Sequence, residues 1–212
     1  MDLTDGVKTA AHQEGRTVLA EYEAKAFLAD YGVPVVLEKK AGDIPAAVAA
    51  AREIGFPVVL KGLGKELLHK TENQLVHLNL ETEASVKAAA QAVSQSAGDR
   101  LEAYLIQPQV TGKREFVAGL FNDAQYGAVV MFGLGGIFTE VLSDVTFRLA
   151  PISSADATEM ITELHASAML GAVRGEPPVN RDRLIQTLTG LSRLAEENAD
   201  IREIDINPLL ID

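Results

Sequence analysis

One predicted loop has a lysine just before it and a histidine within it. Lys61 ends the apolar strand-like run of residues 57–60, and His69 lies in the glycine-containing segment that follows. An imidazole is a good phosphoryl acceptor near neutral pH, and an ammonium group at a strand end suits a phosphate. A buried strand followed by a solvated loop would give the same pattern. The segment alone leaves both interpretations open.

The last predicted strand, residues 201–210, carries a second group of polar side chains. Glu203, Asp205 and Asn207 alternate there with apolar residues, so the three polar side chains share one face of the strand. Carboxylate and amide oxygens are ligands that suit a hard cation such as Mg²⁺. An edge strand with its polar face turned to water has the same pattern. A magnesium site is therefore one of two interpretations.

A glycine cluster at residues 133–136 precedes Glu140, Asp144 and Arg148. Clustered glycines let backbone N–H groups approach an anion closely, and they serve a sharp turn or bulge equally well. The cluster is not the dinucleotide fingerprint, because strands are predicted on both sides of it and that fingerprint needs a helix after it. Arg148 is a candidate phosphate clamp, and an ion pair with Asp144 is the alternative.

Composition excludes several classes of function. The 212 residues carry a net charge of −11, so no nucleic-acid partner is expected. The sequence has no cysteine, which removes disulfides, thiolate metal sites and cysteine nucleophiles. The first residues lack the apolar core of a signal peptide, and no apolar stretch is long enough to span a membrane. We expect a cytoplasmic protein without a membrane partner.

Helix and strand patterns alternate along the chain, with a break at residues 108–112. The first half predicts helices over 20–31, 43–54 and 82–96, and strands over 33–37, 56–61, 74–80 and 101–107. The second half predicts a hairpin of 114–121 and 125–132, one or two strands within 137–149, helices over 155–169 and 181–198, and the strand 201–210. These patterns predict two α/β subdomains.

Together the motifs resemble the ATP-grasp domain of NDP-forming acyl-CoA synthetases. This group includes the nucleotide-binding β subunits of ADP-forming acetate–CoA ligase and, more distantly, of succinate–CoA ligase. The matching stretches occur in the family's order from about residue 18 to the end. They are residues 21–25, 31–34, 55–61, 69–72, 107–115, 130–138, 140–151 and 205–209.

The resemblance implies an α/β ATP-grasp fold with two α/β subdomains and the nucleotide site between them. Residues 1–17 would be an N-terminal extension. Residues 18–107 would form the first subdomain with the histidine loop, and residues 108–212 the second subdomain with the glycine segment and the magnesium-binding strand.

The resemblance also implies a role for each candidate residue. His69 would accept a phosphoryl group and relay it to Mg-ADP, Lys61 would contact the nucleotide phosphates, and Gln107 would face the adenine. The other residues implied to bind nucleotide are Glu115, Gly135, Gly136 and Arg148, and those implied to hold Mg²⁺ are Glu140, Asp205 and Asn207.

The activity implied is that of an acid–thiol ligase, which interconverts acyl-CoA and carboxylate with ATP or ADP. It would require a separate CoA-binding α subunit, through which the carboxylate and CoA would bind. Two departures leave an alternative open. Residues 73–76 replace a Gly-Gly-Val-like turn, and relatives typically add a short aspartate-bearing strand beyond the position of Asp212. The alternative is a non-catalytic nucleotide-sensing module that regulates a partner such as an acetyltransferase.

Overall fold

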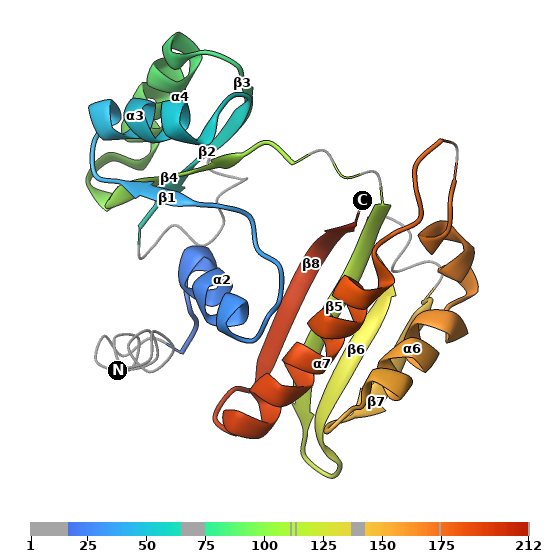
Figure 1. Cartoon of the computed structure of the whole chain (residues 1–212). Helices are drawn as coiled ribbons and strands as arrows, with labels where there is room; N and C mark the ends of the chain where they lie inside the picture. The colour runs from blue at the N-terminus through green and yellow to red at the C-terminus, as the bar shows by residue number, and fades with distance from the viewer. Residues whose placement is uncertain are drawn as a thin grey trace. The chain divides into compact units, whose positions relative to one another are not determined.

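The computed structural model describes residues 17–64, 75–110, 112, 114–136, 143–173 and 175–211. Packing divides the chain into two compact units. One is Val36–Thr111, and the other combines Met1–Val35 with Gly112–Asp212. Each unit has its own four-stranded antiparallel sheet and its own hydrophobic core (Figure 1). The protein is thus a mixed α/β protein with two sheets.

The smaller unit, Val36–Thr111, is a sheet covered on one face by two helices (Figure 1). Its elements are β1 (Lys39–Ala41), α3 (Ile44–Ile54), β2 (Val58–Leu63), β3 (Val76–Leu80), α4 (Glu83–Ala97), η1 (Gly98–Arg100) and β4 (Ala103–Pro108). The strand order is β1-β4-β2-β3. The side chains of Asp43 and Thr82 cap the two helices, as their residue types predict. Both helices bury mainly alanine and valine, so they pack closely on the sheet.

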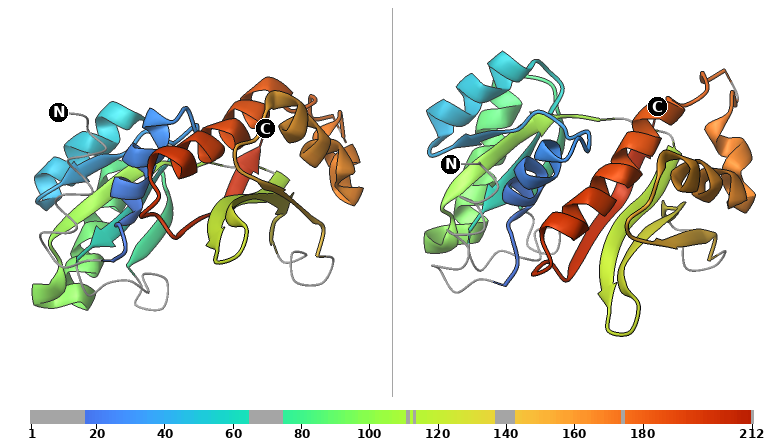
Figure 2. Two further views of the ribbon diagram at one scale, coloured as in Figure 1. Left: turned by 90° about the horizontal axis from the view of Figure 1, so that it is seen from below. Right: turned by 60° about the horizontal axis from the view of Figure 1, so that its bottom comes forward.

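The larger unit has a sheet in the order β7-β6-β5-β8, and its helices α6 and α7 lie on one face of that sheet (Figures 1 and 2). Its elements are α2 (Glu21–Asp30), β5 (Arg114–Asp123), β6 (Gly127–Leu134), β7 (Val145–Leu149), α6 (Ser154–Glu163), η3 (His165–Leu170), α7 (Arg181–Glu197) and β8 (Glu203–Ile211). The helix-facing side chains of the strands form the core. Phe116 and Phe132 are fully buried there, and their rings stack with centroids 5.4 Å apart.

Helix α2 packs with the larger unit, although the expected division put it with residues 18–107. Phe27 and Leu28 are buried in the same core as the sheet and α7. The chain after α2 passes so close to α7 that a Cβ on Gly190 would lie 2.3 Å from the carbonyl oxygen of Tyr31. The apolar face of α2 therefore belongs to a core formed by residues far along the chain.

Two predicted elements differ in the structure. Residues 33–37 are not a strand, and the first strand of that region is β1. The helix predicted over 155–169 ends at Glu163, and a 3-10 helix, η3, follows Leu164. Among the described residues, no helix is long and apolar enough to cross a membrane.

Candidate functional site

The edge strand β8 presents oxygen-bearing side chains on the face of the sheet that α6 and α7 leave uncovered. Ile204 and Ile206 pack against the core, so the exposed Glu203, Asp205 and Asn207 point to the opposite face, as the alternation predicts. Asp205 pairs with Gly119 of β5. We call this side of the sheet the open face.

Glu115 lies on the same open face, at the start of β5. Its neighbour Phe116 points into the core, so the Glu115 side chain is on the other side and is exposed. Its carbonyl oxygen accepts a hydrogen bond of 2.9 Å from the N–H of Gly135. The glycine segment therefore folds back onto the first residues of β5.

Only glycine fits this turn. A Cβ on Gly135 would lie 2.6 Å from the carbonyl oxygen of Phe116, which cannot move without the strand. A Cβ on Gly136 would lie 2.8 Å from Oε2 of Glu115, and Gly136 has a φ of +72°. Residues that have a side chain rarely adopt that backbone conformation. The absence of side chains at these two positions thus lets the segment pack directly against the start of β5.

Asp205 lies in an environment that disfavours its charge. Although Asp205 is exposed as a residue, partial desolvation of its carboxyl group raises the pKa, and the negative charge of Glu203 raises it further. A bound cation would relieve both effects. Among the described residues, no three acidic or histidine side chains gather as a metal site. Two of the three predicted magnesium ligands, Asp205 and Asn207, are on the open face, and the third, Glu140, lies outside the described residues.

Arg148 is not part of this group. On β7 it pairs with Val130, a core residue, so its side chain points to the helix-covered face. There the guanidinium donates a hydrogen bond of 2.6 Å to Glu163 of α6, and Glu159 lies 3.6 Å away. The structure therefore separates Arg148 from Asp205 and Asn207. Its ion-pair partners are glutamates of α6 and not Asp144, which was the alternative.

In the smaller unit, Lys61 and Gln107 lie on one face of the sheet. β2 and β4 pair Lys61 with Leu105 and Val59 with Gln107, so Lys61 and Gln107 are diagonal neighbours. Leu60 points the other way, into the core beneath α3 and α4. Lys61 thus lies on the face opposite the helices. It lies within β2 and not at its end as predicted, because the strand continues to Leu63.

One atom of Gln107 is of special interest. Its Oε1 is buried and has no hydrogen-bond partner among the described residues. A buried acceptor without a donor costs free energy, about 1–3 kcal/mol. A ligand that offers an N–H group would remove this cost. Nε2 of His77, a residue of β3, is also buried and has no hydrogen-bond partner in the described part of the chain.

The candidate phosphoryl acceptor, His69, lies outside the described residues, so its predicted role stays a prediction. The described residues place Lys61 and Gln107 in one unit, and Glu115, Gly135, Gly136, Asp205 and Asn207 in the other. Sequence reasoning missed Arg114, a buried residue next to Glu115 whose contacts are described below. Its only sequence signal was its position in a matched motif.

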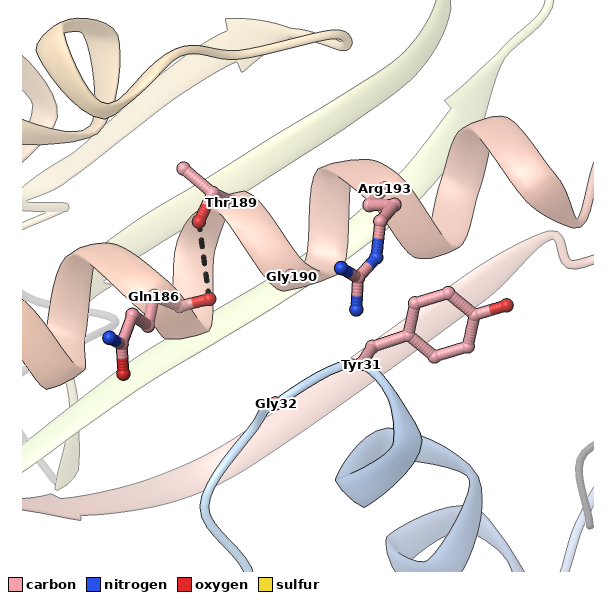
Figure 3. Close-up of a pocket in the computed structure, with 6 residues that line it drawn as sticks. All are labelled: Tyr31, Gly32, Gln186, Thr189, Gly190 and Arg193. Atoms are coloured by element: carbon pink, nitrogen blue, oxygen red, sulfur yellow. Dashed lines mark hydrogen bonds between the residues drawn. The ribbon is translucent and has the colours of Figure 1, made fainter.

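A surface pocket lies elsewhere in the larger unit (Figure 3). It is lined by Tyr31, Gly32, Gln186, Thr189, Gly190 and Arg193. The Arg193 guanidinium lies 5.3 Å from the centre of the Tyr31 ring, and the Asn198 side chain donates a hydrogen bond of 2.8 Å to the Tyr31 hydroxyl. These contacts fix the end of α2 on α7. None of the predicted site residues lines this pocket.

Comparison with known proteins identifies relatives over nearly the whole chain. A family model described as an ATP-grasp domain matches residues 10–212. The β subunit of ADP-forming acetate–CoA ligase II from Pyrococcus furiosus is 39% identical in an alignment of 204 residues that covers 93% of this chain and 86% of that one. The β subunit of ligase I from the same organism is 40% identical in an alignment of 196 residues that covers 90% of this chain and 84% of that one.

A solved structure has the same fold. It is the acetyl-coenzyme A synthetase 1 of Ca. Korarchaeum cryptofilum in complex with coenzyme A and Mg-AMPPCP, with a phosphohistidine segment pointing towards the nucleotide binding site. It superposes with a TM-score of 0.88 at 37% sequence identity, covering 98% of this chain and 92% of that chain. The chain therefore belongs to the ATP-grasp family, among the homologues of the β subunits of ADP-forming acetate–CoA ligases.

Proposed function

We propose that this chain is the nucleotide-binding β subunit of an ADP-forming acyl-CoA synthetase, and that it relays a phosphoryl group between a phosphohistidine and Mg-ADP. Its relatives carry that name, and the structural relative binds coenzyme A and a magnesium–nucleotide complex. A chain that belongs to this family is expected to perform the same half of the reaction.

The observation that carries the proposal is the open face of the larger sheet. Glu115, Asp205 and Asn207 share that face, and Gly135 and Gly136 pack against Glu115. Oxygen ligands for a hard cation thus lie on the same face as the carboxylate against which the glycine segment packs.

The residues present fit a magnesium ion. Asp205 and Asn207 would hold it, and Glu140 is the third proposed ligand. Mg²⁺ usually takes one or two protein oxygens together with phosphate oxygens and water, so this donor set is sufficient. When bound, Mg²⁺ neutralises charge on the phosphate oxygens. The raised pKa of Asp205 is consistent with a cation beside it, because a positive charge would offset both burial and Glu203.

Each unit contributes residues proposed to bind nucleotide. Lys61 would meet the phosphates, and Oε1 of Gln107 would accept a hydrogen bond from the exocyclic amino group of adenine. That bond would satisfy the buried oxygen that now has no partner. The glycine segment and Glu115 would lie at the phosphate end. Arg148 is left out because its guanidinium is engaged by two glutamates on the helix-covered face.

His69 would be the phosphoryl carrier. A neutral ring nitrogen attacks phosphorus, a new P–N bond forms, and the bond from phosphorus to the donor group breaks with its electron pair. In the second step a β-phosphate oxygen of ADP attacks the same phosphorus, the P–N bond breaks, and ATP forms. The acyl group, CoA and the first phosphohistidine would belong to a separate CoA-binding α subunit.

The proposal is tested by isothermal titration of the chain with ADP, with and without Mg²⁺. We expect saturable binding that Mg²⁺ strengthens. Asp205→Ala should abolish the strengthening by Mg²⁺. Glu203→Gln, on the same face of the same strand, is the matched control and should retain it. The absence of any ADP binding, or binding that Mg²⁺ leaves unchanged in the wild-type chain, would overturn the proposal.

A further inference from the structure

Two buried charged side chains hold one short segment of the larger unit. The guanidinium of Arg114, which is 5% exposed, donates to the carbonyl oxygens of Met169, Gly171 and Pro177 at 3.2, 3.1 and 2.7 Å. The carboxylate of Asp144, which is 6% exposed, accepts from the backbone N–H groups that begin η3. We call residues 165–173 and 175–177 the brace.

The contacts of Asp144 are equally short. Its oxygens accept hydrogen bonds of 2.9 Å from the N–H of His165 and 2.7 Å from the N–H of Ala166. The anion therefore lies at the start of η3 and the cation of Arg114 near its end. Each charge faces backbone groups of the matching polarity. A buried charge is tolerated only when it is hydrogen-bonded in this way, so each contact fixes the brace firmly.

The brace connects the two strands that flank the glycine segment. β6 is the strand between β5 and β7. Its last residue, Leu134, pairs with Phe116, and Gly133 pairs with Val145. The end of β6 therefore lies level with the start of β5 and the start of β7. Arg114 begins β5, and Asp144 directly precedes β7. The brace thus runs across this end of the sheet on the helix-covered side.

The same two strand ends also hold the glycine segment on the open side. The N–H of Gly135 donates to the carbonyl oxygen of Glu115, and the N–H of Leu134 donates to the carbonyl oxygen of Asp144, both at 2.9 Å. The backbone of the glycine segment is therefore hydrogen-bonded to Glu115, the residue after Arg114, and to Asp144 itself. Any change in the spacing of these two anchors would move the glycine segment.

We propose that Arg114 and Asp144 are positioning residues that set the place of the glycine segment for the nucleotide phosphates. This inference rests on the proposed function. Neither side chain touches the nucleotide, because both point to the helix-covered face. Arg114 and Asp144 act through the backbone of Glu115 and Gly135, and through the brace to which both side chains are hydrogen-bonded. The reaction tolerates little displacement of a group that binds phosphate.

The test compares the affinities of the chain for Mg-ADP and for AMP by isothermal titration. ADP reaches the glycine segment with its second phosphate, and AMP lacks that phosphate. Arg114→Met and Asp144→Asn should weaken ADP binding about tenfold and leave AMP binding unchanged, because only the phosphate end is displaced. Arg114→Lys keeps a cation at the brace and should recover part of the loss.

Asn122→Ala is the matched control. At the opposite end of β5, the Asn122 side chain donates a hydrogen bond of 2.7 Å to the carbonyl oxygen of Ile201. Its loss should lower the unfolding temperature without changing the ratio of the ADP and AMP affinities. If Arg114→Met does not fold, Arg114→Lys and Asp144→Asn decide the question.

Two outcomes would overturn the inference, and they are distinguishable. If the brace variants fold less stably but keep the wild-type ratio of affinities, Arg114 and Asp144 are structural residues only, and the proposed function stands. If the wild-type chain binds ADP no better than AMP, the proposed function fails together with the positioning role.

Discussion

At the scale of single residues, the unpartnered Oε1 of Gln107 gives the sharpest prediction about the nucleotide base. If it accepts from the adenine amino group, Gln107→Leu should weaken ADP binding about tenfold, the value of one hydrogen bond. Guanine has a carbonyl oxygen at that position and cannot donate. GDP binding should therefore change little in the same variant. Titrations with both nucleotides test this, and an equal loss for ADP and GDP would show that Gln107 does not read the base.

Asp144 predicts a dependence of stability on pH. Burial by itself would raise the pKa of its carboxyl group, but hydrogen bonds from Ala166 and His165 outweigh burial, so the pKa lies below the usual aspartate value. The stabilisation is therefore complete above the usual aspartate pKa, and it is lost as pH falls from there through the depressed value. Asp144→Asn should cost about 2 kcal/mol in the free energy of unfolding at neutral pH.

That cost should shrink as the pH falls, because protonation removes the same charge from the wild-type chain. Denaturant unfolding of both proteins across the acid range measures it. A difference in unfolding free energy that stays constant down to the lowest pH at which both proteins fold would contradict the stabilising role of the Asp144 charge.

The polar residues of the open face could be predicted from the sequence, but the face and the contacts of Arg148 could not. Alternation along the last strand was enough to place Asp205 and Asn207 on one face. Arg148 was equally foreseeable as a charged strand residue, but its face was not. That face depends on pairing with β6 and on α6, whose glutamates come later in the chain. Local sequence does not contain this information.

At the scale of elements, the docking of α2 on α7 depends on Gly190. Alanine in a helix is normally favoured over glycine, by about 1 kcal/mol. Here a Cβ would meet the backbone oxygen of Tyr31 at 2.3 Å, so Gly190→Ala should instead destabilise the protein by about 1–3 kcal/mol. Thermal unfolding checks this. Gly42→Ala is the control, because a Cβ there has open space and the backbone is not left-handed. A Gly190→Ala variant as stable as that control would contradict the close approach.

Helix ends were predicted well where a cap is local and poorly where it is not. Asp43 and Thr82 each precede the helix that they cap, so the sequence reveals them. The end of α6 has no such signal. Its successor η3 begins where Asp144, about twenty residues earlier in the chain, accepts hydrogen bonds from the backbone. A continuous helical pattern over 155–169 therefore concealed a break that tertiary contacts impose.

At the scale of the whole molecule, the account predicts that the chain needs a partner. Purified alone, it should show no acyl-CoA turnover, because the CoA and carboxylate sites are proposed to lie on the α subunit. With a CoA-binding α subunit added, it should form ATP from ADP, phosphate and acetyl-CoA, which a coupled assay for ATP detects. ATP formation by the isolated chain would contradict the division of labour proposed here.

The order of motifs along the chain was sufficient to predict the family and the two α/β units, because each motif combines a strand end with a chemically distinctive residue. The packing of α2 with the larger unit was not predictable. Its apolar face, which includes Phe27 and Leu28, fits any nearby core, and the core that it joins is built from β5, β6 and α7. Long-range choices of this kind are set by packing and not by local pattern.

The most direct test of the central claim is phosphoryl transfer to His69. The chain is incubated with Mg²⁺ and ATP labelled at the γ-phosphate, and acid-labile, base-stable label on the protein is measured. We predict label on the wild-type chain and on the His12→Ala, His77→Ala and His165→Ala variants, and none on His69→Ala. A wild-type chain that binds Mg-ATP and takes up no label, or label that persists in His69→Ala, would contradict the relay. The former result is the behaviour of a nucleotide sensor.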